Sequence, residues 1–405
     1  MKRVVVTGIG ALSAIGHTAD ECFNGLISGA CGVDYIKLFD TQDNGIKIGA
    51  EVKNFDPTEV VSPKDIKKSD RFIQLGLKAA KEAFLDSGVS EKDYDFDRFG
   101  VSAASGIGGL STIERNARLC ETSGPRRVSP FFVPSSLVNM LGGLASIEYG
   151  LKGPNISSVT ACAAGTHSII ESYKTIVSGG ADAMMSVGAE SAICMLGVSG
   201  FSNMKALSSI EDPLKASRPF DKNRAGFVIG EGAGALILEE YESAKKRGAK
   251  IYAEVIGYGE SGDAHHITAP APEGEGAYRA MKAALKMANV DKIDYINAHG
   301  TSTKFNDWYE SVAIGRIFGD KAPPVSSIKG NIGHCLGAAG SIEAGMICKM
   351  LEQNVLVPTL NYDTPDEDCT LDYIPNTARD AKVNTVMSNS FGFGGTNGVV
   401  VLKRV

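Results

Sequence analysis

The sequence lacks the features that mark membrane, secreted and metal-binding proteins. Among its 405 residues, no apolar run approaches the about 18 to 20 residues that are needed to span a bilayer. Its eight cysteines are scattered and form no C-x-x-C pair, which argues against a disulfide framework and against a zinc site. We therefore expect a cytoplasmic protein with reduced thiols, no metal site, no cofactor and no membrane insertion.

The amino-terminal run MKRVVVTGIG has the basic start of a signal peptide but not its apolar core. Gly8, Gly10 and Ser13 interrupt any such core, so the run is better read as a first strand. Positive charge is also in deficit, since 41 Lys and Arg residues against 47 Asp and Glu residues give a net charge of -6. This balance argues for solubility and against a nucleic-acid-binding surface.

What the chain does contain is a regular alternation of strand-like and helical segments. Strand-like runs cover 4–10, 99–106, 181–190, 233–240, 253–260 and 294–300, and amphipathic stretches cover 71–87, 166–178, 277–288 and 342–353. Such alternation is typical of an α/β fold with covered sheets. The 47 glycines cluster in GIGG, GEGAG, GFGG and GAAG, which indicates tight turns and close backbone approaches.

The order of these segments repeats along the chain. VVVTGIG (4–10), GVSAASG (100–106), ISSVTACAAG (156–165) and MSVGAE (185–190) are echoed in order by AEVIGYG (253–259), YINAHGT (295–301), VSSIKGNIGH (325–334) and MSNSFG (387–392). Any α/β chain offers strand–glycine turns, but four pairs in order favour a duplicated unit. We expect halves at 1–250 and 251–405 that place their turns around one shared site.

Cys162, in VTACAAG, stands between a strand-like run and a helical run. Free cysteine is often simply a buried packing residue, so this position alone leaves both core packing and nucleophilic catalysis open. The repeat favours catalysis, because the counterpart turn carries Lys329 and leads to His334, and a neighbouring turn carries His299. For His167, five residues after the cysteine, we expect a packed position inside the helix.

Seven stretches extend this pattern over nearly the whole chain. They are GIGGL (106–110), GPRRVSPFFVPSSLVNM (124–140), GPNISSVTACAAG (153–165), ASRPFDKNRAGFVIGEGAG (216–234), INAHGTST (296–303), KGNIGHCLGAAG (329–340) and SNSFGFGGTNG (388–398). In content and order they resemble the bacterial β-ketoacyl-acyl-carrier-protein synthases, the type II elongating condensing enzymes. The resemblance implies the thiolase fold, two βαβαβαββ halves in a layered α-β-α-β-α architecture, which agrees with the repeat.

Proteins of the same fold with other activities differ at defined positions. Thiolases carry a cysteine in the last glycine-rich motif, where this chain has Phe391–Asn397 without one. Chain-length-factor subunits lack the nucleophile, and initiating synthases combine cysteine with His and Asn instead of two histidines. The resemblance therefore implies a decarboxylating condensation of an enzyme-bound acyl group with malonyl-acyl-carrier protein in fatty acid elongation. A ketosynthase of a specialised polyketide pathway and a non-catalytic partner subunit are the alternatives.

The resemblance also implies roles at the reaction centre. Cys162 is the acyl-accepting nucleophile, and the amides of Cys162 and Phe393 form an oxyanion hole. His299 and His334 donate hydrogen bonds, as neutral rings, to the malonyl thioester carbonyl. Lys329 orients His334 or holds it neutral. Because Cys162 lies where a helix begins, we expect the helix dipole to lower the pKa of its thiol towards neutrality.

Four further residues are implied as substrate contacts. Ile107 would form the wall of the acyl pocket and limit chain length. Phe391 would buttress Phe393, which would swing as a gate when the site is acylated. Thr301 and Thr303, in the motif INAHGTST, complete the set.

Two acids are implied as supporting residues around the reaction centre. Glu343 would pair with Lys329, and Asp307 follows the HGTST motif. The resemblance also allows a structural cation near Asn297, Glu343 and Ser388, for which the sequence carries no motif of its own.

The implied partners are an acidic acyl carrier protein, loaded with acyl or malonyl groups, and a second copy of the chain in a homodimer. Basic runs would receive the carrier, although such runs are also ordinary solvated faces. The candidates are Lys64, Lys67, Lys68, Arg126 and Arg127. Where the family often has proline after HGTST, this chain has Lys304, which leaves the loop shape and fine substrate preference open.

Overall fold

The sheet of the protein consists of two sets of five strands. A computed structural model describes residues 2–405. In the first set, the order across the sheet is β5 (Asn155–Ser158), β4 (Phe99–Ala104), β6 (Ala183–Glu190), β7 (Gly232–Glu240) and β1 (Val4–Leu12). In the second set, the order is β10 (Val325–Ser326), β9 (Tyr295–Asn297), β13 (Thr385–Gly392), β14 (Thr396–Lys403) and β8 (Ala253–Gly262).

The two sets have the same topology. When the strands of each half are numbered from one to five along the chain, both sets follow the order 3-2-4-5-1. In both, strand 2 pairs in parallel with strands 3 and 4, and strand 5 pairs antiparallel with strands 4 and 1. The sets join where Val4–Val6 pair with Ala253–Val255. The duplicated α/β unit that the repeated turns predicted is confirmed.

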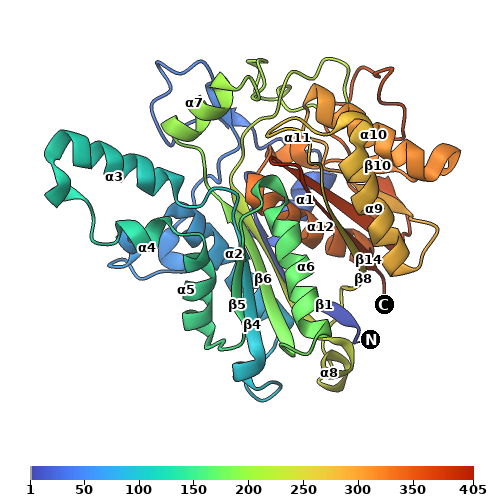
Figure 1. Ribbon diagram of the computed structural model, residues 1–405, viewed down its shortest axis with the longest axis horizontal. Coiled ribbons are helices and arrows are strands. Elements are labelled where there is room, and N and C mark those ends of the chain that lie inside the picture. The colour runs from blue at the N-terminus through green and yellow to red at the C-terminus, as the bar shows by residue number, and fades with distance from the viewer. Residues whose placement is uncertain (1) are drawn as a thin grey trace.

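Helices cover both faces of the sheet and fill the space between its halves. α2 (Arg71–Ser87) packs on the first set and α9 (Glu275–Ala288) on the second, with α10 (Lys304–Phe318) beside α9. α6 (Ala164–Val177) and α12 (Ala339–Gln353) contact each other and strands of both sets. In Figure 1, α6 lies over the central strands, with α2 and α9 on either side. This is the predicted layered α-β-α-β-α architecture.

Glycines in the first strand of each half let a helix lie directly on the backbone. A Cβ on Gly10 of β1 would lie 2.1 Å from the carbonyl oxygen of Ala79 in α2. A Cβ on Gly259 of β8 would lie 1.9 Å from that of Ala280 in α9. A larger residue at either position would force strand and helix apart. Glycine in the first strand of each half therefore serves helix–sheet packing.

Smaller elements surround this core. α3 (Leu110–Ser123) and α4 (Phe132–Ser136) project as an arm, and α5 (Asn139–Tyr149) packs beside them (Figure 1). The others are α1 (Ala19–Ile27), α7 (Met195–Asn203), α8 (Tyr241–Lys246), α11 (Lys329–Ile332), β2 (Asp34–Tyr35), β3 (Ile48–Gly49), β11 (Val355–Leu356) and β12 (Arg379–Asp380). Among residues 2–405, no helix has both the length and the apolar character of a membrane crossing.

One of the hydrophobic clusters contains residues of both halves. Val4 and Ile169 from the first half and Ile347 and Val400 from the second are buried in the same cluster. The link between α8 and β8 contains the boundary predicted at residues 250 and 251. A division into separate halves at that point stays a prediction.

Candidate active site

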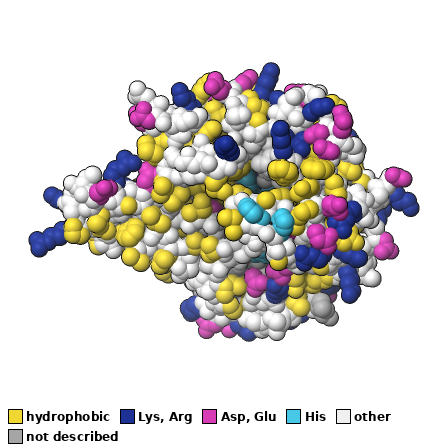
Figure 2. All heavy atoms as spheres, turned by 45° about the horizontal axis from the view of Figure 1, so that its top comes forward, with side chains coloured by type: hydrophobic (Ala, Val, Ile, Leu, Met, Phe, Trp, Pro, Cys, Tyr) yellow, Lys and Arg dark blue, Asp and Glu magenta, His cyan; other side chains and the backbone are white. Residues whose placement is uncertain are grey.

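Turns from both halves line one cavity of about 570 Å³. Figure 2 shows histidine side chains beside a hollow near the centre of one face of the molecule. The first half contributes the loop after β4 and the turn before α6, and the second contributes the loops after β9 and β13 and the turn before α12. Eight of the predicted site residues line it: Ile107, Cys162, His299, Thr301, Thr303, His334, Phe391 and Phe393.

Cys162 lies in the middle of a three-residue turn, Ala161–Ala163, that connects β5 to α6. Ala161 adopts φ of 49°, in the left-handed region that residues other than glycine avoid. The amide of Ala163 donates to the carbonyl of Thr160 at 3.1 Å and closes the turn. The thiol is 6% exposed and faces the cavity. Such a strained turn in front of a helix presents a side chain to a substrate.

The expectation that the Cys162 thiol has a pKa near neutrality is wrong for this geometry. Burial raises the pKa of the thiol to about 12, and the carboxylate of Glu190 adds to the rise. The Lys329 ammonium and the backbone amides of Phe393 and Cys162 lower the pKa, but burial outweighs them. Helix α6 begins two residues later, at Ala164. A thiolate at this position has little water to solvate it, so the resting thiol keeps its proton.

His299 and His334 lie side by side in the cavity. Their ring centroids are 5.3 Å apart and the rings are nearly perpendicular, at 84°. Burial holds the pKa of both rings well below the usual range, and the charge of Lys329 lowers both further. Both rings are therefore neutral at physiological pH. A neutral imidazole carries one N–H, which suits donation to a carbonyl oxygen.

The backbone of His299 is held by an acid that the sequence reasoning missed. Glu310 of α10 accepts the amides of His299 at 2.9 Å and Gly300 at 2.8 Å, and Asn389 donates to it at 3.1 Å. Glu310 is buried, and burial raises the pKa of its carboxyl to about 7. It lies three residues after Asp307, one helical turn along, which is the signal that was available in the sequence.

Asp307 holds the next part of the same loop. Its carboxylate accepts the amides of Thr301 at 2.9 Å, Ser302 at 3.1 Å and Phe220 at 2.7 Å. The hydroxyls of Thr301 and Thr303 lie 2.9 Å apart and face the cavity. Two acids on one turn of α10 therefore hold the four consecutive amides from residue 299 to residue 302.

Lys329 and Glu343 form a buried ion pair behind the histidines. The ammonium of Lys329 donates to Oε1 of Glu343, and each side chain is 1% exposed. Lys329 does not line the cavity, so it acts on the two rings through its charge. The arrangement fits the electrostatic role proposed for Lys329 from the resemblance.

Two buried oxygens next to this pair have no hydrogen-bond partner among residues 2–405. They are Oδ1 of Asn297 and Oε2 of Glu343. The amide group of Asn297 donates to the hydroxyl of Ser388 at 3.1 Å, which brings the third implied residue to the same point. Hard cations prefer oxygen ligands of this kind, so these residues fit the structural cation that the resemblance allows. Within the described chain, no cluster of three His, Cys, Asp or Glu side chains forms a metal site.

Phe391 and Phe393 lie at the turn between β13 and β14. The ring of Phe391 is 5.7 Å from that of His299, and the ring of Phe393 is 6.4 Å from that of Phe201. Gly394 and Gly395 follow with φ of 82° and 71°, which only glycine adopts readily. The amide of Phe393 acts on the Cys162 thiol together with the amide of Cys162 itself. Two backbone donors therefore converge on the sulfur of Cys162.

Ile107 lies in the loop after β4, where its side chain lines the cavity and is 36% exposed. A second acid that the sequence reasoning missed, Glu190, accepts hydrogen bonds from this loop. It ends the apolar strand-like run ADAMMSVGAE, and a charged residue at the end of a buried strand was the available signal.

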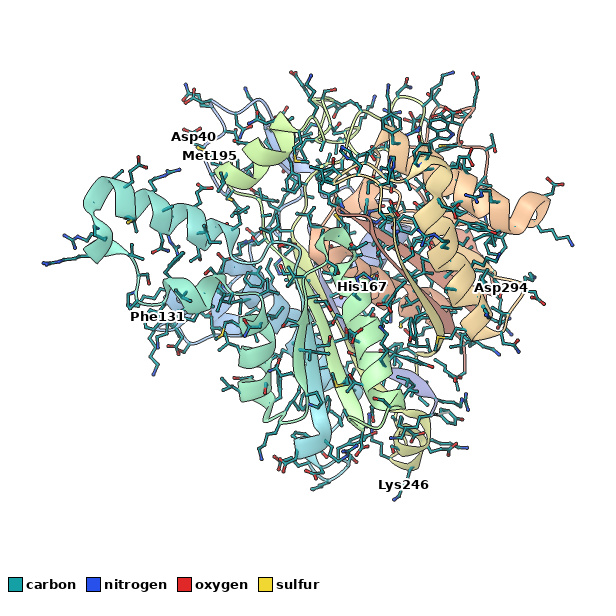
Figure 3. All side chains as sticks on the ribbon, in the orientation of Figure 1. Asp40, Phe131, His167, Met195, Lys246 and Asp294 are labelled. Carbon is teal, nitrogen blue, oxygen red and sulfur yellow. The ribbon has the colours of Figure 1, made fainter. Side chains whose placement is uncertain are left out.

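His167 lies in α6, in the middle of the molecule (Figure 3). Its Nδ1 is 2.7 Å from the hydroxyl of Thr160, and the ring does not line the cavity. His167 therefore occupies a buried position within the helix, as expected. By this contact it supports the residue that precedes the Cys162 turn.

The basic candidates for carrier docking lie outside the cavity. Lys64, Lys67 and Lys68 surround a short 3-10 turn before α2, and Arg126 and Arg127 lie in a turn between α3 and α4. The two groups are linked, since the Lys68 ammonium lies 5.4 Å from the centre of the Phe131 ring. Figure 3 places Phe131 on the arm. They share one side of the molecule.

Comparison with known proteins identifies the family of the chain. Residues 1–244 match the N-terminal domain of β-ketoacyl synthases, and residues 252–363 match their C-terminal domain. The chain is 49% identical over 409 residues to a 3-oxoacyl-[acyl-carrier-protein] synthase 2 of Coxiella burnetii, covering 100% of this chain and 99% of that protein.

Solved structures with the same fold include two close matches. A β-ketoacyl synthase from Burkholderia phymatum superposes with a TM-score of 0.93 at 36% identity and covers 100% of both chains. A ketosynthase solved in complex with a type II polyketide acyl-carrier protein gives a TM-score of 0.93 at 34% identity, covering 100% of this chain and 99% of that one. The chain belongs to the β-ketoacyl synthase family and is an acyltransferase of the elongating, type 2 group.

Proposed function

We propose that the chain condenses an enzyme-bound acyl group with malonyl-acyl-carrier protein, with loss of CO2, in fatty acid elongation. The observation that carries this proposal is the convergence in one cavity of a thiol and two neutral imidazoles from opposite halves of the chain, Cys162, His299 and His334. A nucleophile is needed to hold the acyl group, and a pair of donors is needed to stabilise an enolate.

In the first stage, the sulfur of Cys162 attacks the thioester carbon of the acyl carrier. The bond from this carbon to the carrier sulfur breaks, and the departing sulfur takes up the proton that the cysteine loses. Because burial keeps the resting thiol protonated, the proton leaves during attack and not before it. The amides of Cys162 and Phe393 donate to the tetrahedral oxyanion, and the loss of one such donor costs about 3 kcal/mol.

In the second stage, malonyl-carrier protein occupies the same cavity. His299 and His334 donate to its thioester oxygen while the bond to the carboxylate carbon breaks and CO2 leaves. The electron pair of that bond forms the enolate, whose carbon attacks the acyl group on Cys162. The bond from the acyl carbon to the Cys162 sulfur breaks, and the sulfur takes up a proton from solvent to restore the thiol. Neutral donors suit this step, because a charged ring would carry a proton acidic enough to quench the carbanion. Burial keeps both rings neutral, and the charge of Lys329 adds to this effect.

The residues that support this centre act without touching the substrate. Glu310 and Asp307 hold the amides of His299 to Ser302, and Glu343 balances the charge of Lys329. A cation held by Asn297, Glu343 and Ser388 would add rigidity and charge balance behind the histidines. Thr301 and Thr303, whose hydroxyls face the cavity, would orient the pantetheine arm.

We propose acyl carrier protein as the partner that delivers both substrates. The basic residues of the α3–α4 arm and of the turn before α2 are exposed and suit an acidic partner. The solved ketosynthase complex described above contains a carrier protein, which supports this choice.

All eight cysteines are free of disulfides, in keeping with a reducing cytoplasm.

We further propose that two copies of the chain pair along β5. This strand ends the sheet, and its Ile156 is partly exposed. Ile147 of α5 is 77% exposed and Val133 of α4 is 57% exposed. Figure 2 shows apolar side chains gathered on the side that carries the arm. An unpaired strand edge beside an apolar face favours association, and sedimentation would show a dimer.

Incubation of the protein with acyl-carrier protein and malonyl-carrier protein tests the function. We expect release of CO2 together with a β-ketoacyl-carrier product. Product formed only from acetyl-CoA would indicate a thiolase instead. An absence of both product and thiol acylation would indicate a partner subunit without activity. Repeated extension of one chain without release would favour a polyketide ketosynthase.

A further inference from the structure

Glu190, the last residue of β6, has its carboxylate fully buried beside the cavity. Five donors point at its two oxygens, and they come from two separate segments of the chain. Oε1 accepts from Ser105 Oγ at 2.8 Å, Ile107 N at 3.2 Å and Gly108 N at 3.2 Å, and Oε2 accepts from Gly106 N at 2.6 Å and Gly337 N at 3.0 Å. No cation pairs with this carboxylate among residues 2–405.

The two segments that meet at Glu190 both form walls of the cavity. The loop 105–108 carries Ile107, and the turn Leu336–Ala338 follows His334 and contributes Leu336. They touch so closely that only glycine fits at the contact. A Cβ on Gly337 would lie 2.1 Å from the amide nitrogen of Gly106, and a Cβ on Gly106 would lie 2.7 Å from Glu190 Oε2.

The donors around the carboxyl group favour its ionised form. Three consecutive amides, one distant amide and one hydroxyl are directed at its two oxygens. A protonated carboxyl group could direct its O–H only at the Ser105 hydroxyl, and its protonated oxygen would be a poorer acceptor for the amides. Burial raises the pKa of this carboxyl, and the hydrogen bonds from Ser105, Gly337, Gly106 and Ile107 lower it. The ionised form makes all five bonds, and the backbone of Ile107 is positioned through the bond that its own amide makes to Glu190.

We propose that Glu190 is a positioning residue that holds the Ile107 loop against the turn after His334 and so sets which acyl-chain lengths the cavity accepts. The inference rests on the proposed function, because it concerns the acyl pocket of that reaction. Ile107 forms the wall of the acyl pocket, and Glu190 fixes the position of this wall. A shift of the loop would open or close the pocket without any change of a residue that touches the chain.

The same carboxylate acts on the nucleophile through its charge. The charged and titratable groups that face Cys162 are Glu190, Lys329 and the neutral rings of His299 and His334. Glu190 raises the pKa of the thiol and Lys329 lowers it. Removing the charge of Glu190 should therefore ease deprotonation of Cys162, whereas moving this charge slightly should not.

Two substitutions separate these effects. Glu190→Gln removes the charge and places an NH2 group among donors, so that at least two of the five bonds are lost whichever way the amide turns. Glu190→Asp keeps the charge but is too short to reach both segments. As the matched control we choose Glu239→Gln, a buried carboxylate of β7 that accepts from Tyr94 at 2.6 Å and pairs with Arg247 away from the cavity.

The first readout is the acyl-chain distribution on Cys162, measured by intact-mass spectrometry after exposure to a mixture of acyl-carrier proteins. We expect both Glu190 variants to change the ratio of longer to shorter chains several-fold and Glu239→Gln to leave it unchanged. The second readout is the pH at which iodoacetamide alkylates the Cys162 peptide at half its maximal rate. This midpoint should fall for Glu190→Gln and stay near the parent value for Glu190→Asp.

A wild-type chain distribution in both Glu190 variants, with a loss of thermal stability like that of the control, would show a purely structural role and overturn the proposal. If Glu190→Gln does not fold, Ser105→Ala removes a single donor and should shift the distribution in the same direction by a smaller factor. An unchanged distribution in both Ser105→Ala and Glu190→Asp would equally overturn it. If the parent enzyme does not become acylated, the proposed function fails. The role of Glu190 is tested separately, by comparing the acyl-chain distribution of each variant with that of the parent.

Discussion

The two halves of the chain build the same turn and place different chemistry on it. Ala161 and Leu336 adopt φ of 49° and 46°, and each begins a three-residue turn directly before a central helix. The segments read ACAAG at 161–165 and LGAAG at 336–340, so Gly337 occupies the position that matches Cys162. The repeated fold provides two equivalent turns, and only one carries a nucleophile. In the second half, His334 lies two residues before the turn.

This difference shows that the packing of the two turns and the chemistry at one of them depend on different residues. At the crossing of α6 and α12, a Cβ on Gly165 would lie 2.8 Å from the amide of Ser341. Reciprocally, a Cβ on Gly340 would lie 2.1 Å from the hydroxyl oxygen of Thr166. Small residues are therefore needed in both turns so that the halves can approach and share one cavity. Only Cys162 is needed for the acyl group.

Removal of the nucleophile or of a histidine should have the largest effect on activity. We expect Cys162→Ala to reduce acyl transfer below detection, because no other cysteine lines the cavity within residues 2–405. We expect His334→Ala to acylate normally and to condense about a hundred- to a thousandfold more slowly, the effect of losing one donor to a developing oxyanion. Intact-mass spectrometry reports the first step, and CO2 release reports the second.

The reverse pattern would contradict these assignments. Acylation of another residue in Cys162→Ala would rule out the nucleophile assignment, and parental decarboxylation by His334→Ala would rule out the enolate role. His299→Ala serves as the internal comparison and should resemble His334→Ala.

Substitutions at the crossing of α6 and α12 should test the symmetry of the scaffold. Gly340→Ala and Gly165→Ala should each lower the free energy of unfolding by about 1–3 kcal/mol, because the added methyl group meets backbone or hydroxyl atoms of the other helix. Gly345→Ala, in the same helix α12, meets nothing within 4 Å and should be neutral or stabilising by up to about 1 kcal/mol. Urea unfolding measures all three. A similar loss in Gly345→Ala would mean that helix geometry, not the crossing, sets the cost.

Each half also has a carboxyl group whose pKa burial raises to about 7, the half-buried Glu82 in the first and the buried Glu310 in the second. A carboxyl with a raised pKa binds its proton more tightly in the folded state. The free energy of unfolding should therefore fall as the pH rises from about 4.5 to about 7 and then level off. Glu82→Gln and Glu310→Gln should each flatten part of this slope. Urea unfolding at a series of pH values measures it, and an unchanged slope in both variants would contradict the burial argument.

Much of this could be predicted from the sequence, because small-residue turns recur in a fixed order. The repeated segments predicted the duplicated fold, and the motifs around Cys162, His299 and His334 predicted which turns would meet. The repeated segments did not predict that Gly337 matches Cys162. The paired segment VSSIKGNIGH (325–334) ends before Gly337, because more residues separate the strand from the turn in the second half than in the first. The thiol pKa was predicted in the wrong direction, since burial depends on segments remote in sequence.

The smallest expected effect concerns the arm, which the first half has and the second lacks. We expect Arg126→Glu with Arg127→Glu to raise the KM for carrier-protein substrates about two- to fivefold and to leave kcat unchanged, in line with the ~0.2–1 kcal/mol of an exposed ion pair. The effect should shrink as salt is added, because exposed charges are screened. Lys245→Glu with Lys246→Glu, on α8 and away from the arm (Figure 3), makes the same change in net charge and is the control. Steady-state rates at two salt concentrations would measure both. An equal rise in KM for this α8 double variant would show that the carrier responds to total charge, and the arm would then have no docking role of its own.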